Sequence, residues 1–412
     1  MGYKVKVLQN KKLIAANAVY SMLFVAVSLT ITSPILIEIS NSLNVSVALA
    51  GLLFTFLSAG YISGALLNNI VCKYFKRKYV YRAVLFTQIV FFIVFAISKN
   101  IYVSFMSFFM LGFCCGFLDV IINTLMVQLY RSNPGFSLNL THILFGVGAF
   151  LGPAISSQIV GHGLNWSLAI FIVAVLVLIN FILSLFLEIP SSDNYVGRKL
   201  LAANGLKEFG NPGSGQMLPK LNLGLLLLIM FAFFMMAATQ QGFSAWMPSF
   251  LRIERGFSSI LAGQSLSFFW AALSIGRLIV GIISRRIRLE KMVIFLSFFC
   301  FIFAFISLYF DNKVVAIASF LLMGAFHSGI WPSLLALGSI YFKDRNNFVI
   351  SILSVTGSLG GLFAVSLINF IYKNTNSLRL GLFIVSSFIF ITFIILVVNY
   401  FVNRMKIKAN LI

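Results

Sequence analysis

The sequence predicts an all-α polytopic membrane protein, with twelve transmembrane helices arranged as two six-helix halves. The first reason is composition: of 412 residues, 60% are hydrophobic and 9% are charged. So few charged residues cannot cover the surface of a soluble globule. The second reason is a series of apolar segments, each long enough to cross a bilayer. The third is that the alternating ten-residue pattern of outer-membrane strands does not occur.

Twelve apolar segments follow one another with short loops between most of them. They cover approximately residues 13–37, 46–71, 83–98, 102–130, 136–160, 166–188, 221–250, 258–284, 291–310, 314–341, 348–372 and 379–402. A long polar interval, rich in Gly, Pro and Ser, separates the sixth from the seventh. We therefore expect an N-terminal six-helix bundle over residues 1–189, a cytoplasmic linker over 190–220 and a C-terminal six-helix bundle over 221–412.

The positive charges indicate which way the chain crosses the membrane. A net charge of +21 could suit a nucleic-acid-binding protein. Most of the 30 lysines and arginines, however, lie at the termini, in the linker or in loops on the same side of the membrane as these segments. The opposite side carries six, namely Lys99, Arg252, Arg255, Lys313, Lys373 and Arg379. By the positive-inside rule, we expect a multi-pass protein of the cell (inner) membrane with both termini cytoplasmic and no nucleic-acid partner.

The two halves repeat each other at a constant offset of 212 residues. Gly64 corresponds to Gly276, Gly112 to Gly324 and Gly148 to Gly360. Because each half contains an even number of spans, the halves share one orientation and are related by an axis along the membrane normal.

One stretch places ionisable and polar side chains inside two successive spans. In the fourth predicted span, Gly112, Gly116, Asp119 and Asn123 fall at helical spacing and share one stripe. Asp119 is expected roughly 16 Å from the helix end, near the middle of the membrane. Desolvation favours the neutral form of such a carboxyl, so Asp119 is a candidate proton-coupling residue, with a fixed packing role as the alternative.

Histidine and arginine in the spans are further candidates. His142 of the fifth span lies at a different depth from Asp119, so a direct contact is not expected, although a water or Asn123 could bridge them. We expect His142 to relay protons or to satisfy its ring nitrogens locally. Arg277 in the eighth span is a candidate for gating or charge pairing, or for a stabilising contact with carbonyl groups.

Amide and aromatic side chains suggest where a polar solute binds. Gln240, Gln241 and Trp246 lie close together in the seventh span. Amides can bond pairs of sugar hydroxyls, and an indole ring can stack on the apolar face of a pyranose. Asn123 and Trp331 are weaker candidates for the same site. The alternative is that these residues serve as polar contacts between helices.

No catalytic or metal site is visible in the sequence. The four cysteines (Cys72, Cys114, Cys115 and Cys300) lie in spans or at their edges, without the spacing of metal ligands. A nucleophile beside a base and a phosphate-binding glycine loop are both missing. We expect no enzyme activity, no metal and no cofactor.

Five motifs together resemble the fucose:proton symporter branch of the major facilitator superfamily. They are LGFCCGFLDVIINT at 111–124, LNLTHILFGVGAFLGP at 138–153, SAWMPSFL at 244–251, SFFWAALSIGRLIVG at 267–281 and GIWPSLLALGS at 329–339. The resemblance covers essentially the whole chain. At two positions where branch members often carry acids, this chain has Gln240 and, before Pro34, Thr30 and Thr32. The loop motif of the superfamily is reduced to CKYFKRK.

The resemblance implies a secondary transporter that moves a small polar solute, most simply a sugar, together with protons by alternating access. Its partners are then the solute, protons and the lipid bilayer, and we expect a monomer. Two alternatives remain open. One is a carrier of another metabolite (an amino acid, a nucleoside or a carboxylate siderophore) or an exporter, where Arg277 would be the cation for a carboxylate. The other is a membrane sensor that does not transport.

Overall fold

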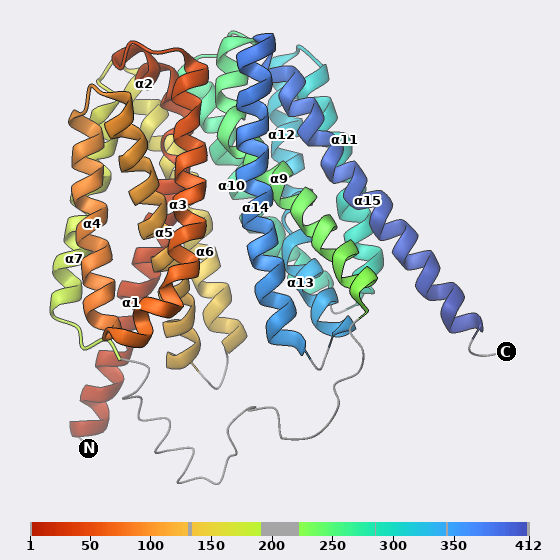
Figure 1. Ribbon diagram of the computed structural model, residues 1–412, viewed down its shortest axis with the longest axis horizontal. Coiled ribbons are helices and arrows are strands. Elements are labelled where there is room, and N and C mark those ends of the chain that lie inside the picture. Colours follow the sequence, from red (N-terminus) through yellow and green to blue (C-terminus); the bar gives the residue numbers. More distant parts are fainter. Residues whose placement is uncertain (1, 131–133, 191–221, 285, 343–344, 410–412) are drawn as a thin grey trace.

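The computed structural model describes residues 2–130, 134–190, 222–284, 286–342 and 345–409. All the regular secondary structure in these residues is helical. Twelve helical segments are long and apolar enough to cross a membrane (Figure 1). The prediction of an all-α protein with twelve spans is therefore confirmed. Apart from Pro190, the predicted linker at 190–220 lies outside the described residues.

The first six spans come from the first half of the chain. Their elements are α1 (Gly2–Thr30), the 3₁₀ turn η1 (Ser33–Ile35), α2 (Leu36–Ser42), α3 (Val47–Tyr74), α4 (Arg77–Ile97), α5 (Ile101–Leu129), α6 (Pro134–Gly161) and α7 (Ser167–Leu185). The first span is broken at Pro34, which occupies the first turn of η1 and has no N–H to donate. Ser46 and Asn100 cap the starts of α3 and α5 by accepting backbone N–H groups.

The other six spans come from the second half. Their elements are α9 (Leu223–Ile253), α10 (Ser259–Ile283), α11 (Leu289–Tyr309), α12 (Lys313–His327), α13 (Ile330–Tyr341), α14 (Asn346–Thr375) and α15 (Leu378–Ala409). The tenth span, predicted as continuous, is divided at Ser328 and Gly329 into α12 and α13. Figure 1 shows the two sets of helices side by side, with both chain ends toward the same end of the bundle.

The third span begins earlier than predicted, because two arginines have partners there. Instead of starting at residue 83, α4 starts at Arg77. The Arg77 side chain is buried and donates a 2.5 Å hydrogen bond to Gln128 of α5. Arg82 donates to the carbonyl oxygens of Ser184 and Leu187 at 3.0 Å. These partners satisfy the charged groups, so the helix includes a segment that composition alone assigns to a loop.

Glycines allow helices to pack backbone against backbone in the same way in both halves. A Cβ on Gly112 of α5 would lie 2.0 Å from the carbonyl oxygen of Leu57 on α3. A Cβ on Gly324 of α12 would lie 2.4 Å from the carbonyl oxygen of Phe269 on α10. Gly112 and Gly324 are 212 residues apart, and so are Leu57 and Phe269; this is the offset found in the sequence. The internal repeat therefore corresponds to the same backbone-on-backbone contact in the two halves.

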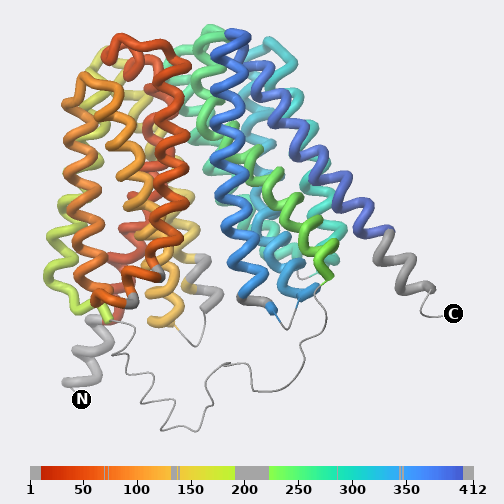
Figure 2. The backbone as a smooth tube through the Cα atoms, in the orientation of Figure 1, coloured from red at the N-terminus to blue at the C-terminus, as the bar shows by residue number. Residues whose placement is uncertain are grey.

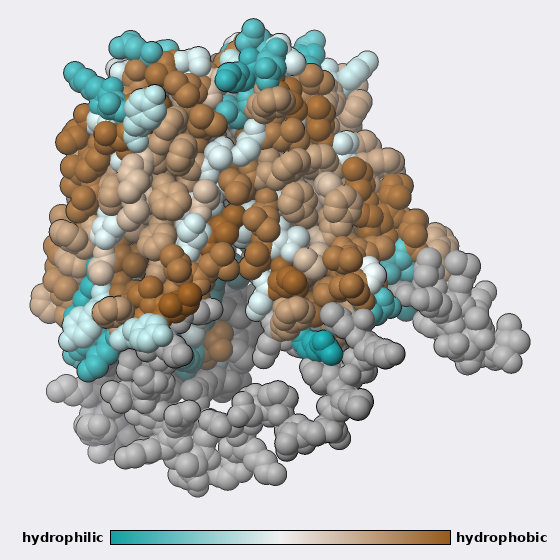
Figure 3. All heavy atoms as spheres, viewed as in Figure 1, coloured by the Kyte–Doolittle hydropathy of each residue, from teal (hydrophilic) through white to brown (hydrophobic). Residues whose placement is uncertain are grey.

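At the end of the molecule opposite the termini, the two halves are joined; we call this the closed end. Arg252 of α9 holds Glu38 of α2 through two bonds of 2.6 and 2.8 Å, and also donates to the Pro34 carbonyl. The Ser33 hydroxyl lies 2.9 and 2.7 Å from the carbonyl oxygens of Ser244 and Ala245. Toward the end that carries the termini the bundles separate (Figure 2), and the surface is hollowed between them (Figure 3).

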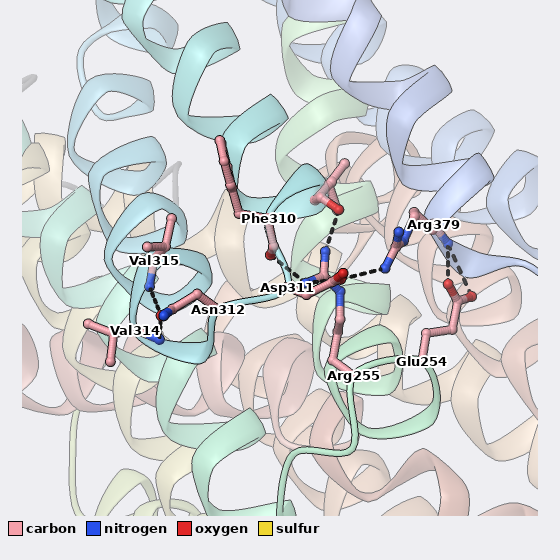
Figure 4. A network of polar contacts seen from close by, with 9 residues as sticks. Glu254, Arg255, Phe310, Asp311, Asn312, Val314, Val315 and Arg379 are labelled. Atoms are coloured by element: carbon pink, nitrogen blue, oxygen red, sulfur yellow. Dashed lines mark hydrogen bonds and ion pairs between the residues drawn. The ribbon is translucent and has the colours of Figure 1, made fainter.

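A second polar network ties three loops of the C-terminal half at the closed end (Figure 4). Asp311 pairs with Arg255 at 2.8 Å and with Arg379 at 3.1 Å. Glu254 accepts the backbone N–H groups of Leu378 and Arg379. Burial, followed by the charge of Arg379, lowers the pKa of the Arg255 guanidinium from its ordinary value, and Asp311 opposes that effect. These contacts hold the α9–α10, α11–α12 and α14–α15 loops as one unit.

Candidate functional site

Asp119 of α5 is held by two neutral hydrogen-bond donors inside the N-terminal half. The Tyr61 hydroxyl of α3 donates to Oδ2 at 2.5 Å, and the Asn123 amide donates to Oδ1 at 2.8 Å. No cation pairs with the Asp119 carboxylate among the described residues. All three side chains are partly exposed. The carboxyl is therefore solvated by the protein without being neutralised by it.

Close approach of α3 and α5 brings Tyr61 to Asp119. A Cβ on Gly116 would lie 2.1 Å from the carbonyl oxygen of Tyr61, so only glycine permits this separation of the two helices. Asp119 lies about one turn further along α5, within reach of the tyrosine hydroxyl. Tyr61 was not singled out from the sequence, because its bond to Asp119 joins residues 58 positions apart. The small-residue pairs Gly60/Gly64 and Gly112/Gly116 were the available signal.

Asn123 extends the network to α6. Its Oδ1 accepts a hydrogen bond of 3.3 Å from the hydroxyl of Thr141. The sequence suggested Asn123 as a bridge between Asp119 and His142, but the described contact of Asn123 on α6 is with the neighbouring Thr141. The structure thus links Tyr61, Asp119, Asn123 and Thr141 across three helices. His142 is not bonded to this chain of contacts among the described residues.

His142 and Arg277 lie instead where the two halves separate. Gly146 of α6 packs on α10: a Cβ added to Gly146 would lie 1.9 Å from the hydroxyl oxygen of Ser274. His142 and Arg277 lie about one turn closer to the end that carries the termini, each on its own helix. His142 is exposed and Arg277 is half-buried. Because α6 packs on α10, His142 and Arg277 lie on neighbouring helices of opposite halves.

His327 is a third basic group close to Arg277. It ends α12 just before the break in the tenth span, and its Nε2 lies 3.2 Å from the Met236 carbonyl oxygen. The side chain is 1% exposed, and its Nδ1 has no partner among the described residues. A Cβ on Gly276 would lie 2.5 Å from the Ser328 hydroxyl, so Arg277 and His327, which follow and precede these residues, lie on closely packed segments. Arg277 therefore lies near His327 within the C-terminal half, and its helix packs against the α6 helix that carries His142.

The three candidates on α9 have different environments. Gln241 is exposed and lies against Gly361 of α14, whereas Gln240 is 7% exposed. Trp246 is fully buried; its indole N–H donates to the Val365 carbonyl at 3.2 Å, and its ring lies against Gly51 and Phe54 of the other half. In this conformation the Trp246 ring is a contact between the halves, with no face free to stack on a solute.

Trp331 of α13 is more accessible than Trp246. It is half-buried and packs on Phe233, with 4.4 Å between ring centroids, and on Gly357. Within the described chain, no three His, Cys, Asp or Glu residues lie together as a possible metal site. The arrangement offers a protonatable carboxyl and a partly exposed amide on one half, and a cation, an exposed amide and an aromatic ring on the other. Such a set can bind a polar solute and a proton.

Comparison with known proteins establishes the family. The family model for the Major Facilitator Superfamily matches residues 18–365, which is most of the chain. The chain belongs to the major facilitator superfamily. Members of this superfamily are transporters and not enzymes, which agrees with the absence of a catalytic motif from the sequence. The small-molecule solute and the membrane setting expected from the sequence follow from this membership.

Individual relatives in the superfamily are distant in sequence but match more than four-fifths of the chain. The glucose/mannose transporter GlcP of Bacillus subtilis (strain 168) is 25% identical over 356 residues, covering 85% of each chain. A TsgA homolog from Buchnera aphidicola subsp. Baizongia pistaciae is 24% identical over 344 residues, covering 81% of this chain and 82% of the relative. Neither comparison specifically supports the fucose:proton symporter branch suggested by the motifs.

Two solved structures share the fold at low sequence identity. A D-xylose–proton symporter superposes with a TM-score of 0.75 at 12% identity, over 93% of this chain and 96% of the symporter. The nucleoside transporter NupG gives a TM-score of 0.70 at 14% identity, over 95% of this chain and 99% of that transporter. These likenesses establish the twelve-helix architecture of this superfamily member.

Proposed function

We propose that this superfamily member is a proton-coupled sugar carrier, similar to the fucose:proton symporters, that works by alternating access. The observation that carries the proposal is the setting of Asp119: a carboxyl on a candidate membrane-spanning helix that is partly exposed, bonded by Tyr61 and Asn123, and without a pairing cation among the described residues. A carboxyl that is not fixed by a salt bridge can change its protonation state during each cycle.

The solute site in this proposal lies between the two bundles. Asn123, Gln241 and Trp331 are partly or fully exposed and supply amides and an aromatic ring for a sugar. Gln240 and Trp246 are buried, so they contact the solute only after the bundles rearrange. In the same proposal His142 exchanges protons with water, because it is exposed and lies apart from the Asp119 network.

The proposed orientation has both termini in the cytoplasm, from the distribution of the lysines and arginines. The described conformation is then open toward the cytoplasm and closed at the opposite end by Arg252 and Glu38. A reporter enzyme that functions only in the cytoplasm should be active when it is fused to either terminus. Activity of a reporter that requires the other compartment would overturn the orientation.

The proposed function is tested by uptake into proteoliposomes that contain the purified full chain. An inward pH gradient, acid outside, should drive accumulation of a labelled sugar above its external concentration, and a protonophore should abolish it. Equilibration without accumulation, at every imposed gradient, would contradict proton coupling. The same assay is run with a panel of sugars, amino acids, nucleosides and organic acids. If the protein transports none of them, a role as a membrane sensor explains it better.

A further inference from the structure

Arg277 is a cation without an anionic partner. Among the described residues its guanidinium makes no hydrogen bond or ion pair, and its Nε is buried and unpartnered. The side chain is half-buried on α10, which packs against α6, and α6 carries the exposed His142. A guanidinium inside a membrane protein is normally paired or bonded to carbonyl groups. The Arg277 site therefore lacks an anionic partner within the described chain.

The described acidic residues do not supply that component. Asp119 is engaged by Tyr61 and Asn123, and the others are engaged with partners away from Arg277. These pairs are Glu38 with Arg252, Glu188 with Lys78, Glu290 with Arg288, Asp311 with Arg255, and Glu254 with backbone N–H groups of α15. An anion that completes the Arg277 site is then best supplied by the solute.

We propose that Arg277, with His142 on the neighbouring helix α6, binds the carboxylate of the transported solute, and that this solute is a sugar acid. This inference rests on the proposed proton-coupled transport and names its substrate class. A planar guanidinium matches a carboxylate through two parallel hydrogen bonds. The exposed amide of Gln241 and the partly exposed amide of Asn123 suit the hydroxyl groups of the same molecule.

The charge balance of the two halves favours a monocarboxylate over a phosphate. When the carrier is empty, ionised Asp119 and Arg277 carry one negative and one positive charge. When it is loaded, protonated Asp119 is neutral and the solute carboxylate offsets Arg277. The pair is neutral in both states, which limits the cost of moving the site across the membrane. One proton and one monocarboxylate then enter together without net charge, whereas a dianion would leave an excess negative charge.

The test compares neutral sugars with their acids in matched pairs: glucose with glucuronate, galactose with galacturonate, and mannose with mannuronate. Binding is measured on the purified full chain and uptake in proteoliposomes. We expect at least one acid to bind about tenfold or more tightly than its neutral partner. Arg277→Gln should weaken binding of that acid by about ten- to a hundredfold, and Arg277→Lys by less. Arg286→Gln, which removes an exposed charge beyond the end of the same helix, should leave it unchanged.

Two further readouts separate this inference from a structural role and from failure of the proposed function. Arg277→Gln should melt no lower than the wild type, because it removes an unpaired charge. Uptake of the acid should respond to a pH gradient and not to an imposed membrane potential. The inference is overturned if no acid binds, if Arg277→Gln binds the acid as tightly as the wild type, or if potential alone drives uptake. Proton-driven uptake of neutral sugars alone would overturn it and leave the proposed function standing.

Discussion

The Tyr61 hydroxyl lies 2.5 Å from Oδ2 of Asp119, and this bond joins two candidate membrane-spanning helices, α3 and α5. It can form because Gly116 lets the backbone of Tyr61 approach α5. On the other oxygen, Asn123 donates from the next turn of the same helix. Asp119 thus has one donor that moves with α3 and one that moves with α5. A shift between these helices would change the solvation of the carboxylate directly.

Replacing Tyr61 by Phe tests whether this bond contributes to coupling. The variant keeps the ring but removes a donor from the ionised carboxylate, so release of the proton becomes less favourable. We expect proton-driven uptake to slow about tenfold or more, because hydrogen bonds to charged groups contribute about 1.5–3 kcal/mol. Exchange of solute at equal pH should change little. Tyr20→Phe is the matched control, since no hydrogen bond to the Tyr20 hydroxyl occurs in the described structure, where its ring packs on Phe24. Equal slowing in both variants would contradict the role of Tyr61.

Gly116→Ala tests the helix contact that positions Tyr61. The added methyl group meets the carbonyl oxygen of Tyr61 at 2.1 Å, so α3 has to move. We expect a loss of about 1–3 kcal/mol of stability, seen as a lower melting temperature in detergent, together with loss of coupled uptake. Gly281→Ala on α10 is the control, because a Cβ there has nothing within 4 Å. It should be neutral or stabilising by up to about 1 kcal/mol. If Gly116→Ala melts at the same temperature as the wild type, the contact between α3 and α5 is not rigid and this prediction is wrong.

Much of this arrangement could be predicted from the sequence, and the reasons differ from residue to residue. The twelve spans and the stripe of Asp119 and Asn123 follow from composition and helical spacing, which are local properties. The Tyr61 bond could not be predicted, because it depends on which helices are neighbours. The break at Ser328 and Gly329 was also missed, since the apolar pattern continues through it.

The position of Trp246 shows another limit of the sequence. A tryptophan near two glutamines suits a sugar-stacking site, yet its ring is placed between the halves against Gly51. Helical spacing indicates which residues share a face, but it does not indicate whether that face meets a cavity or another bundle. Likewise, Arg277 was expected to gate or pair with a charge, and the described chain offers it no acidic partner.

The two tryptophans should therefore respond differently to truncation. Trp246→Ala removes a fully buried ring and should cost about 3–5 kcal/mol, which lowers the folded yield before solute affinity can be compared. Trp331→Ala removes a half-buried ring, so it should fold and bind the solute more weakly. Folded yield by size-exclusion chromatography and solute binding are measured for both variants. A Trp246→Ala protein that folds normally but has lost solute affinity would contradict this assignment.

Glu38→Gln tests the closed end. Losing the charge on Glu38 weakens its paired bonds to Arg252, which should shift molecules toward the state in which this end is open. A cysteine introduced at Ala245, a buried position beside the Ser33 contacts, should react several-fold faster with a membrane-impermeant maleimide added from that side. The native cysteines give the background rate. Glu188→Gln, which weakens the exposed pair with Lys78, is the control. Identical labelling of the two variants would show that the Arg252 pair does not hold this end closed.

The central claim is that Asp119 carries the coupled proton, and its most direct test is Asp119→Asn in proteoliposomes. Asparagine keeps the shape of the side chain and approximates the protonated carboxyl. We predict that accumulation of solute under an imposed pH gradient disappears, while exchange of internal for external solute at equal pH persists, because exchange does not require release of the proton. If Asp119→Asn still concentrates solute under the pH gradient, Asp119 is not the coupling residue.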